Sequence, residues 1–166
     1  AALELLTDVP DLDVLIVPKA RTARDVWWVD VLLTQLETKL GRTRRVGIEV
    51  LIEESEGLAN AAEIARASDR LEAMIFGAGD LSASQRARVD GNFDPVSEYP
   101  GDFWHYARFQ VVTAARAAGI DAIDTPHMRL DDADGLARSN QRARQLGFNG
   151  KSAIHPNQVK TINSVF

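Results

Sequence analysis

The stretch "AMIFGAGDLSAS" at residues 73–84 joins a short apolar run to a single acid. The apolar residues at its start are typical of a buried strand, and the glycines that follow predict a turn. That turn presents one carboxylate, Asp80. An acid in this position is either a turn and helix-capping device or the edge of a binding site. The surrounding sequence has to distinguish the two interpretations.

Short apolar runs alternate with longer segments of helical periodicity along the whole chain. The predicted strands lie within residues 13–18, 45–53, 72–77, 120–125 and 150–155. The predicted helices lie within 22–40, 57–68, 102–119 and 131–147, and a last one opens at Pro156. Strand–helix alternation with short connections predicts right-handed βαβ units and a mostly parallel sheet. The one longer connection, 85–101, is of a length that is usually functional or disordered.

The ends of the predicted strands carry most of the candidate functional residues. In α/β folds the ligand site lies at the carboxyl ends of the strands. The residues found there are Lys19, Glu53, Asp80, Asp124 and His155. Each of them alone has an ordinary structural explanation, such as a helix cap, a solvated turn or, for His155, a hydrogen bond. Their recurrence at one rim of the sheet favours a site.

Glu53 and Asp80 follow successive strands, so a parallel sheet places them side by side. The period of two puts Glu49, Leu51 and Glu53 on one strand face. Neighbouring carboxylates without cysteine are oxygen ligands of the kind that Mg²⁺ takes. Spacing alone leaves three interpretations open: a metal site, capping with salt bridges, and an acid/base pair without metal.

Two further features have competing interpretations. Lys19 either neutralises acids at the strand rim or forms an ion pair with Glu49 or Glu53, and a Schiff-base role is disfavoured beside these acids. The Trp27–Trp28 pair lies on an amphipathic helix, where packing in the core or between subunits is expected.

Composition places the chain among ordinary globular proteins. Its 166 residues allow one domain with a real core, with 45% hydrophobic and 26% charged residues. The net charge of −5 provides no basic face for nucleic acid or for a membrane surface. No apolar run approaches the length needed to span a bilayer. Without cysteine there is no disulfide framework, thiolate metal site or cysteine nucleophile, which fits a cytoplasmic location.

Several motifs together resemble the citrate lyase beta-subunit/malyl-CoA lyase family of the HpcH/HpaI aldolase group. They are "VLIVPKA" (14–20), "IEVLIEESEGLANAAEIA" (48–65), "LEAMIFGAGDLSAS" (71–84), "AIDTPHMRLDDADGL" (122–136) and "LGFNGKSAIHPNQVKTINSVF" (146–166). They occur in the family's order and cover nearly the whole chain. The segment 99–124 is most similar to the malyl-CoA/β-methylmalyl-CoA lyase branch.

This resemblance implies a (β/α)₈ TIM barrel that uses Mg²⁺, with Mn²⁺ as an alternative. It implies Glu53 and Asp80 as metal ligands and catalytic residues, and we choose Glu53 over Glu54 because the motif and the strand face agree. It places Ala78, Gly79 and Asp80 where relatives bind a 2-oxo acid through backbone amides. Ile154 and His155 fall at the thioester side of the site, and Lys19 completes the predicted substrate-binding set.

The resemblance also implies that residues 1–166 are one partial barrel domain, supplying about strands 4 to 8. We expect the first strands, a substrate-binding arginine and a C-terminal lid to lie outside this sequence. Relatives of this kind form homotrimers or homohexamers, which is the expected assembly here.

The expected reaction is the Mg²⁺-dependent cleavage or condensation of a 3-hydroxyacyl-CoA. Malyl-CoA would give acetyl-CoA and glyoxylate, so the partners are a CoA thioester and a small 2-oxo acid. Alternatives are a malyl-CoA thioesterase, a citryl-CoA lyase-like subunit, and a non-catalytic subunit that binds CoA ligands.

Overall fold

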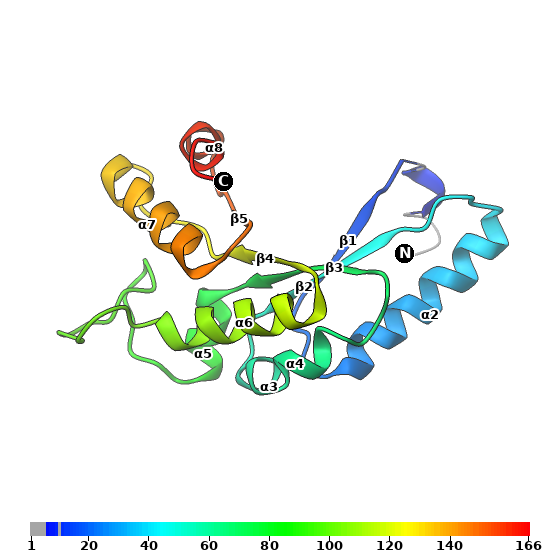
Figure 1. Cartoon of the computed structure of the whole chain (residues 1–166), viewed down its shortest axis with the longest axis horizontal. Helices are drawn as coiled ribbons and strands as arrows, with labels where there is room; N and C mark the ends of the chain where they lie inside the picture. The colour runs from blue at the N-terminus through cyan, green and yellow to red at the C-terminus, as the bar shows by residue number, and fades with distance from the viewer. Residues whose placement is uncertain (1–5, 10) are drawn as a thin grey trace.

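The computed structural model describes residues 6–9 and 11–166, which are built around one parallel sheet (Figure 1). The strands are β1 (Val14–Val17), β2 (Gly47–Ile52), β3 (Leu71–Phe76), β4 (Asp121–Asp124) and β5 (Gly150–Lys151). Their order in the sheet is β1-β2-β3-β4-β5, with every neighbouring pair parallel. Strands that neighbour each other in chain order are what repeated right-handed βαβ units produce in a barrel wall. The predicted α/β class and parallel sheet are confirmed.

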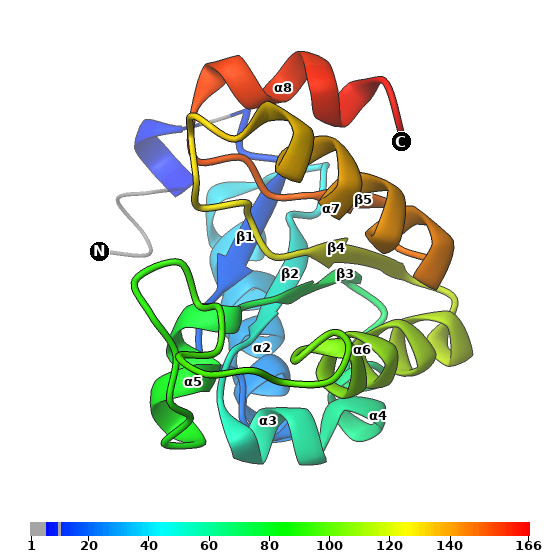
Figure 2. The same cartoon turned by 90° about the vertical axis from the view of Figure 1, so that its left-hand side faces the viewer.

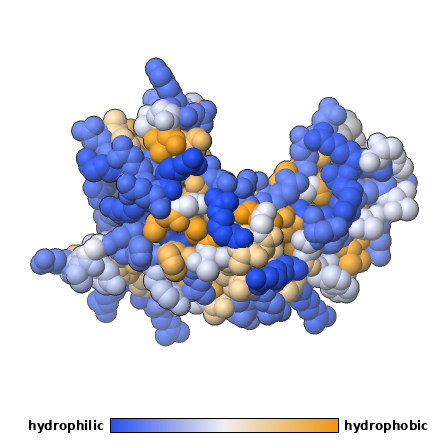
Figure 3. Space-filling view, in the orientation of Figure 1, coloured by the Kyte–Doolittle hydropathy of each residue, from blue (hydrophilic) through white to orange (hydrophobic). Residues whose placement is uncertain are grey.

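Helices cover one side of this sheet. They are α2 (Ala23–Leu40), α3 (Ser55–Ala59), α4 (Ala61–Ile64), α5 (Ala78–Ser84), α6 (His105–Ala118), α7 (Ala133–Leu146) and α8 (Pro156–Asn163). Helices α2 to α6 lie along one side, and α7 and α8 stand at the β5 end (Figures 1 and 2). The layer curves, and the space-filling view shows the hollow between its two ends (Figure 3).

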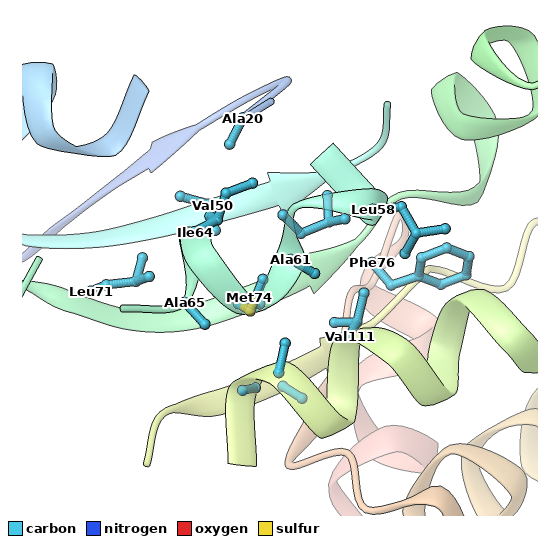
Figure 4. Packing of buried hydrophobic residues seen from close by; sticks show 14 of the residues in the cluster. Ala20, Val50, Leu58, Ala61, Ile64, Ala65, Leu71, Met74, Phe76 and Val111 are labelled. Atoms are coloured by element: carbon cyan, nitrogen blue, oxygen red, sulfur yellow. The ribbon is translucent and has the colours of Figure 1, made fainter. Parts of the chain in front are cut away.

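The strand residues that face the helices form the core. In β2, Ile48, Val50 and Ile52 are fully buried, while Glu49 and Leu51 on the other face are partly exposed. Figure 4 shows Val50 and Met74 of the sheet beside Ile64 of α4 within the same buried cluster. The predicted division of β2 into two faces is confirmed. Glu53 continues the face that the helices leave uncovered in the described chain.

Three predicted elements differ from the structure. The glycines at 77 and 79 do not form a turn: Gly77 is the N-cap of α5, and Gly79 lies inside that helix. The segment 57–68, predicted as one helix, is two short helices separated by Asn60. The last strand ends at Lys151, because the following residues lead into His155, the N-cap of α8.

The tryptophan pair is the other correction. Trp27 and Trp28 are 54% and 61% exposed, so the expected packing in the core of this chain is wrong. The buried stripe of α2 is formed by Val26, Leu33 and Glu37 instead. Among the described residues, no helix has the length and apolar character needed to cross a membrane.

Candidate active site

Glu53 follows β2 directly and is buried, with 8% of its surface exposed. The backbone N–H of Lys19 donates a hydrogen bond to its Oε1 at 3.0 Å. Gly77 lies against the same side chain: a Cβ added there would be 2.7 Å from the Cβ of Glu53 and 3.1 Å from its Oε2. Only glycine permits this approach, so the residue after β3 helps to fix the carboxylate after β2.

Asp80 stands in the first turn of α5, one strand further along the sheet. Its side chain is half exposed and accepts a hydrogen bond from the Lys19 ammonium, with Nζ 2.7 Å from Oδ2. A carboxylate in a first helical turn also interacts favourably with the free backbone N–H groups there. The acid of the opening motif is therefore held by a helix start and by one lysine.

Both carboxylates line one cavity of about 470 Å³ on the hollow side of the sheet. Its apolar wall comes from Leu51 of β2 and Ile75 of β3, whose side chains point away from the helices. The other lining residues are Phe76, Gly77, Gly79, Phe93, Thr125, Pro126 and Ser152. The sequence-predicted pair is thus brought to one pocket.

The two acids have different electrostatic surroundings. Burial is the main cause that raises the pKa of Glu53, and the neighbouring charge of Asp80 raises it further. The hydrogen bond from the Lys19 amide lowers it, but the net shift is upward. The hydrogen bond from the Lys19 ammonium lowers the pKa of Asp80. The described residues place no lysine or arginine side chain within ion-pair distance of Glu53. Glu53 is therefore a buried acid whose charge lacks a side-chain counter-ion there.

This donor set fits a hard divalent cation. Two carboxylates that converge on one cavity suit Mg²⁺, which takes one or two protein carboxylates and completes its octahedron with water and substrate oxygens. Among the described residues, no group of three or more His, Cys, Asp or Glu side chains is arranged as a metal site. The described residues therefore build no closed protein cage of the zinc type, and binding of a cation by the two carboxylates stays a prediction.

Lys19 contacts the site differently from the predicted ion pair with Glu49 or Glu53. Its ammonium is paired with Asp80 and lies 3.6 Å from Oε1 of Glu54, whereas Glu53 receives only its backbone N–H. The predicted pairing with Glu49 or Glu53 is wrong because the ammonium is taken by Asp80 and lies near Glu54. The alternative, that Lys19 neutralises acids at the rim, is confirmed by these contacts.

The predicted backbone amides lie at the start of α5. Ala78 is buried and its N–H donates to the hydroxyl of Thr125 at 3.3 Å. Gly79 lines the cavity beside Asp80. The first N–H groups of a helix have no partner within that helix, and that of Ala78 is satisfied by Thr125. Their role as oxo-acid ligands stays a prediction.

The structure places the remaining candidates away from this cavity. Asp124 is buried between Arg108 and Lys151, and so belongs to an ion network below the rim. His155 is exposed and its Nδ1 accepts the N–H of Asn157, the structural hydrogen bond that was expected. Ile154 is 47% exposed, and neither residue is among those lining the cavity. Their assignment to the thioester side stays a prediction.

Sequence reasoning missed Thr125, Ser152 and Phe93 as cavity residues. Thr125 follows β4, so the rule that ligands bind at strand ends was sufficient to find it. Phe93 belongs to the long connection 85–101. The indole N–H of Trp104, at the start of α6, donates a hydrogen bond to the Phe93 carbonyl and holds that loop against the helix. No periodicity marks a single loop residue, and its place is set by tertiary packing.

Comparison with known proteins identifies the family of the chain. Residues 4–156 match the sequence pattern of the HpcH/HpaI aldolase/citrate lyase family. The chain belongs to this family. It is 40% identical to L-malyl-CoA/beta-methylmalyl-CoA lyase of Cereibacter sphaeroides, over 98% of this chain and 54% of the relative. It is 37% identical to citrate lyase subunit beta of Leuconostoc mesenteroides, over 93% of this chain and 49% of the relative.

A solved family structure has the same fold. The citrate lyase beta subunit of M. tuberculosis, complexed with oxaloacetate and magnesium, superposes with a TM-score of 0.72 at 26% identity. The match covers 96% of this chain and 65% of that one. The recognition of the family and the barrel-type α/β fold are confirmed, and the chain spans about half the length of the curated relatives it matches.

Proposed function

We propose that the protein containing this chain is a Mg²⁺-dependent carbon–carbon lyase that acts on a 3-hydroxyacyl-CoA. The observation that carries the proposal is the convergence of Glu53 and Asp80 on one cavity at the strand ends. The family membership supports it, since lyases of CoA thioesters are among the relatives. Malyl-CoA is the proposed substrate, and the products are acetyl-CoA and glyoxylate.

In this proposal the two carboxylates of the chain hold the cation. Magnesium bound there would stabilise the negative charge that develops on the substrate's 3-hydroxyl oxygen as the C–C bond breaks. Glu53 is fixed for this role by the Lys19 amide and by its contact with Gly77. Asp80 lies in the first turn of α5, and in this proposal the amides of Gly79 and Asp80 would receive the carboxylate of the 2-oxo acid.

The cavity walls have a separate role. Leu51 and Ile75 provide an apolar floor, and Phe93 partly covers Gly79: a Cβ on Gly79 would be 2.9 Å from the Phe93 ring. Apolar surroundings exclude water and strengthen the electrostatic stabilisation of an oxyanion. We place the thioester near Ile154 and His155, and expect a homotrimer or homohexamer in the cytoplasm.

The decisive experiment replaces the exposed ligand. In the full-length protein, Asp80→Ala removes one of two protein ligands, so we expect Mg²⁺-dependent glyoxylate release from malyl-CoA to fall at least about a hundredfold. Asp69→Ala is the matched control, because Asp69 lies before β3, at the opposite end of that strand, and forms an exposed ion pair with Arg45. Wild-type activity in Asp80→Ala would refute the metal assignment.

Product analysis distinguishes the alternative reactions. A lyase releases glyoxylate and acetyl-CoA, whereas a thioesterase releases free malate and CoA. A citryl-CoA lyase-like subunit would instead release oxaloacetate from citryl-CoA. Failure of the wild-type protein to bind Mg²⁺ or any 2-oxo acid would favour a non-catalytic subunit.

A further inference from the structure

Lys19 contacts both predicted metal ligands and does so with a strained backbone. Its N–H donates to Oε1 of Glu53 at 3.0 Å, and its Nζ lies 2.7 Å from Oδ2 of Asp80. Its φ of +53° falls in the left-handed region that side chains other than glycine rarely adopt. Such strain persists where the surrounding structure imposes it, and it concentrates at functional sites.

The neighbouring backbone is held by helix α3 and the residue after it. Ala20 is fully buried, and a Cβ added to Gly57 would lie 2.1 Å from its carbonyl oxygen, so the two backbones are in direct contact. The side chain of Asn60 donates to the carbonyl of Arg21 at 2.9 Å. These contacts fix the Lys19 N–H on Glu53 independently of what the lysine side chain does.

The ammonium, by contrast, lies near two acids. The Lys19 side chain is 46% exposed, and its Nζ lies 2.7 Å from Asp80 and 3.6 Å from Oε1 of Glu54. Glu54 is largely buried and is also 3.6 Å from Arg21. Lysine has a flexible stem and a compact charge, so a small rotation exchanges one partner for the other.

We propose that Lys19 is a positioning residue whose ammonium takes the cation's place on Asp80 in the metal-free protein and passes to Glu54 when a divalent cation binds. The inference rests on the proposed function, because it assumes that Glu53 and Asp80 bind the cation. An ammonium and a divalent cation repel each other and compete for the same carboxylate. The Lys19 N–H keeps Glu53 oriented in both states, and Glu54 receives the displaced charge.

The test measures binding of Mn²⁺ alone to the full-length protein, with free Mn²⁺ followed by EPR. Mn²⁺ takes the same oxygen ligands as Mg²⁺. Lys19→Met removes the competing charge, so we expect the Kd for Mn²⁺ to fall about three- to tenfold. Lys39→Met, at the end of α2, is the matched control and should leave the Kd unchanged. An unchanged or higher Kd in Lys19→Met overturns the inference.

A second variant separates the side chain from the backbone. Lys19→Gly also removes the ammonium but retains the N–H that binds Glu53 and relieves the left-handed strain. We expect it to tighten Mn²⁺ binding as Lys19→Met does. If Lys19→Met tightens binding and Lys19→Gly does not, the introduced methionine side chain, and not the loss of the ammonium, accounts for the tighter binding, and the exchange of charges is wrong.

A double-mutant cycle tests the transfer to Glu54. Glu54→Gln should raise the Kd more in the wild-type background than in Lys19→Met. Only the wild type has an ammonium at position 19 that needs Glu54 as its new partner when the cation binds. Glu56→Gln, on the exposed side of α3, controls for the loss of one negative charge. Equal effects of Glu54→Gln in both backgrounds overturn the transfer. Absence of Mn²⁺ binding by the wild type would instead overturn the proposed function itself.

Discussion

Asp124 accepts two cations on one buried carboxylate. Its Oδ1 is 2.9 Å from Nε of Arg108, and its Oδ2 is 2.5 Å from Nζ of Lys151, with side-chain exposures of 1% or less for Asp124 and Lys151. Arg108 also pairs with Asp102 at 2.8 Å. The carboxylate thereby joins β4, β5 and α6 directly below Thr125. The network fixes the strand end that carries a cavity residue.

We predict that Asp124→Asn destabilises the protein by about 3–5 kcal/mol, because it leaves buried cations without their counter-charge. Burial lowers the pKa of Lys151, and the charge of Asp124 is what opposes that effect. Urea denaturation measures the loss. Asp121→Asn, exposed at the other end of β4, should change stability by no more than about 0.5 kcal/mol. Similar values for both variants would contradict the prediction.

For single residues, the sequence was sufficient where both the residue type and its position pointed to a site. Glu53 and Asp80 combine a strand end with a ligand chemistry, and both reach the cavity. Asp124 had the same two properties, but its carboxylate forms ion pairs with Arg108 of α6 and Lys151 of β5 and does not line the cavity. The sequence does not reveal which acid is already paired, because the partners are distant along the chain.

Among the elements, α7 begins with a defined side-chain cap. The carboxylate of Asp132 accepts the N–H of Gly135 at 2.8 Å. A cap of this kind satisfies one of the free amides of the first turn. The helix it begins packs against β5 and α8, so its start determines how the end of the sheet is covered.

Replacement of Asp132 should reduce stability by the contribution of one capping hydrogen bond. We expect Asp132→Ala to lower the free energy of unfolding by about 1 kcal/mol. Asp131→Ala, its exposed neighbour outside the cap, should have almost no effect. Thermal and urea denaturation of the two variants provide the comparison. Equal stability of Asp132→Ala and the wild type would show that the cap contributes nothing.

The elements themselves were largely predictable, with informative exceptions. The long helices have buried stripes and glycines after their ends, as at Gly119 and Gly147, and their bounds are within a few residues of the prediction. Helix α5 escaped detection because it is short and begins beside two glycines, which lower helix propensity. Tertiary contact imposes that helix: Ala78 is buried and bonded to Thr125.

Across the whole molecule, Arg70 connects distant parts of the chain. Its guanidinium binds Glu37 at 2.6 Å and Asp30 at 2.6 Å, both on α2, and it also donates to the carbonyl of Val46. Its side chain is 2% exposed. Helix α2 is thereby fastened to the segments that precede β2 and β3. This network is at the end of the sheet opposite to the cavity.

The network predicts a specific loss of stability in acid. Burial raises the pKa of both Glu37 and Asp30. Hydrogen bonds outweigh this effect, mainly from Arg70 for Glu37 and from Ser68 and Arg70 for Asp30, so both pKa values are lowered. Acids with a lowered folded-state pKa stabilise the fold above their unfolded-state pKa values. That contribution disappears as the pH falls through the folded-state values.

We therefore expect the stability difference between the wild type and Arg70→Met to be about 3–5 kcal/mol at neutral pH and to narrow below about pH 4. Urea denaturation at a series of pH values measures it. Arg45→Met removes an exposed pair with Asp69 and should cost no more than about 1 kcal/mol. A difference for Arg70→Met that is constant down to acid pH would contradict this assignment.

The strand order of the sheet was predictable as well, because each strand is followed by a helix and then by its neighbour. What periodicity could not provide is the Arg70 network. Arginine at 70 and glutamate at 37 look like ordinary surface charges in the sequence, and only the fold buries them together. Long-range polar pairs of this kind depend on packing that no local pattern encodes.

The contact between Gly77 and Glu53 sets a rule for redesign of this scaffold. A methyl group at position 77 would stand 2.7 Å from the Glu53 Cβ, so directed evolution of the pocket should leave that glycine unchanged. Diversity belongs instead at Leu51 and Ile75, whose side chains shape the same pocket from the strands without touching the geometry of the acid.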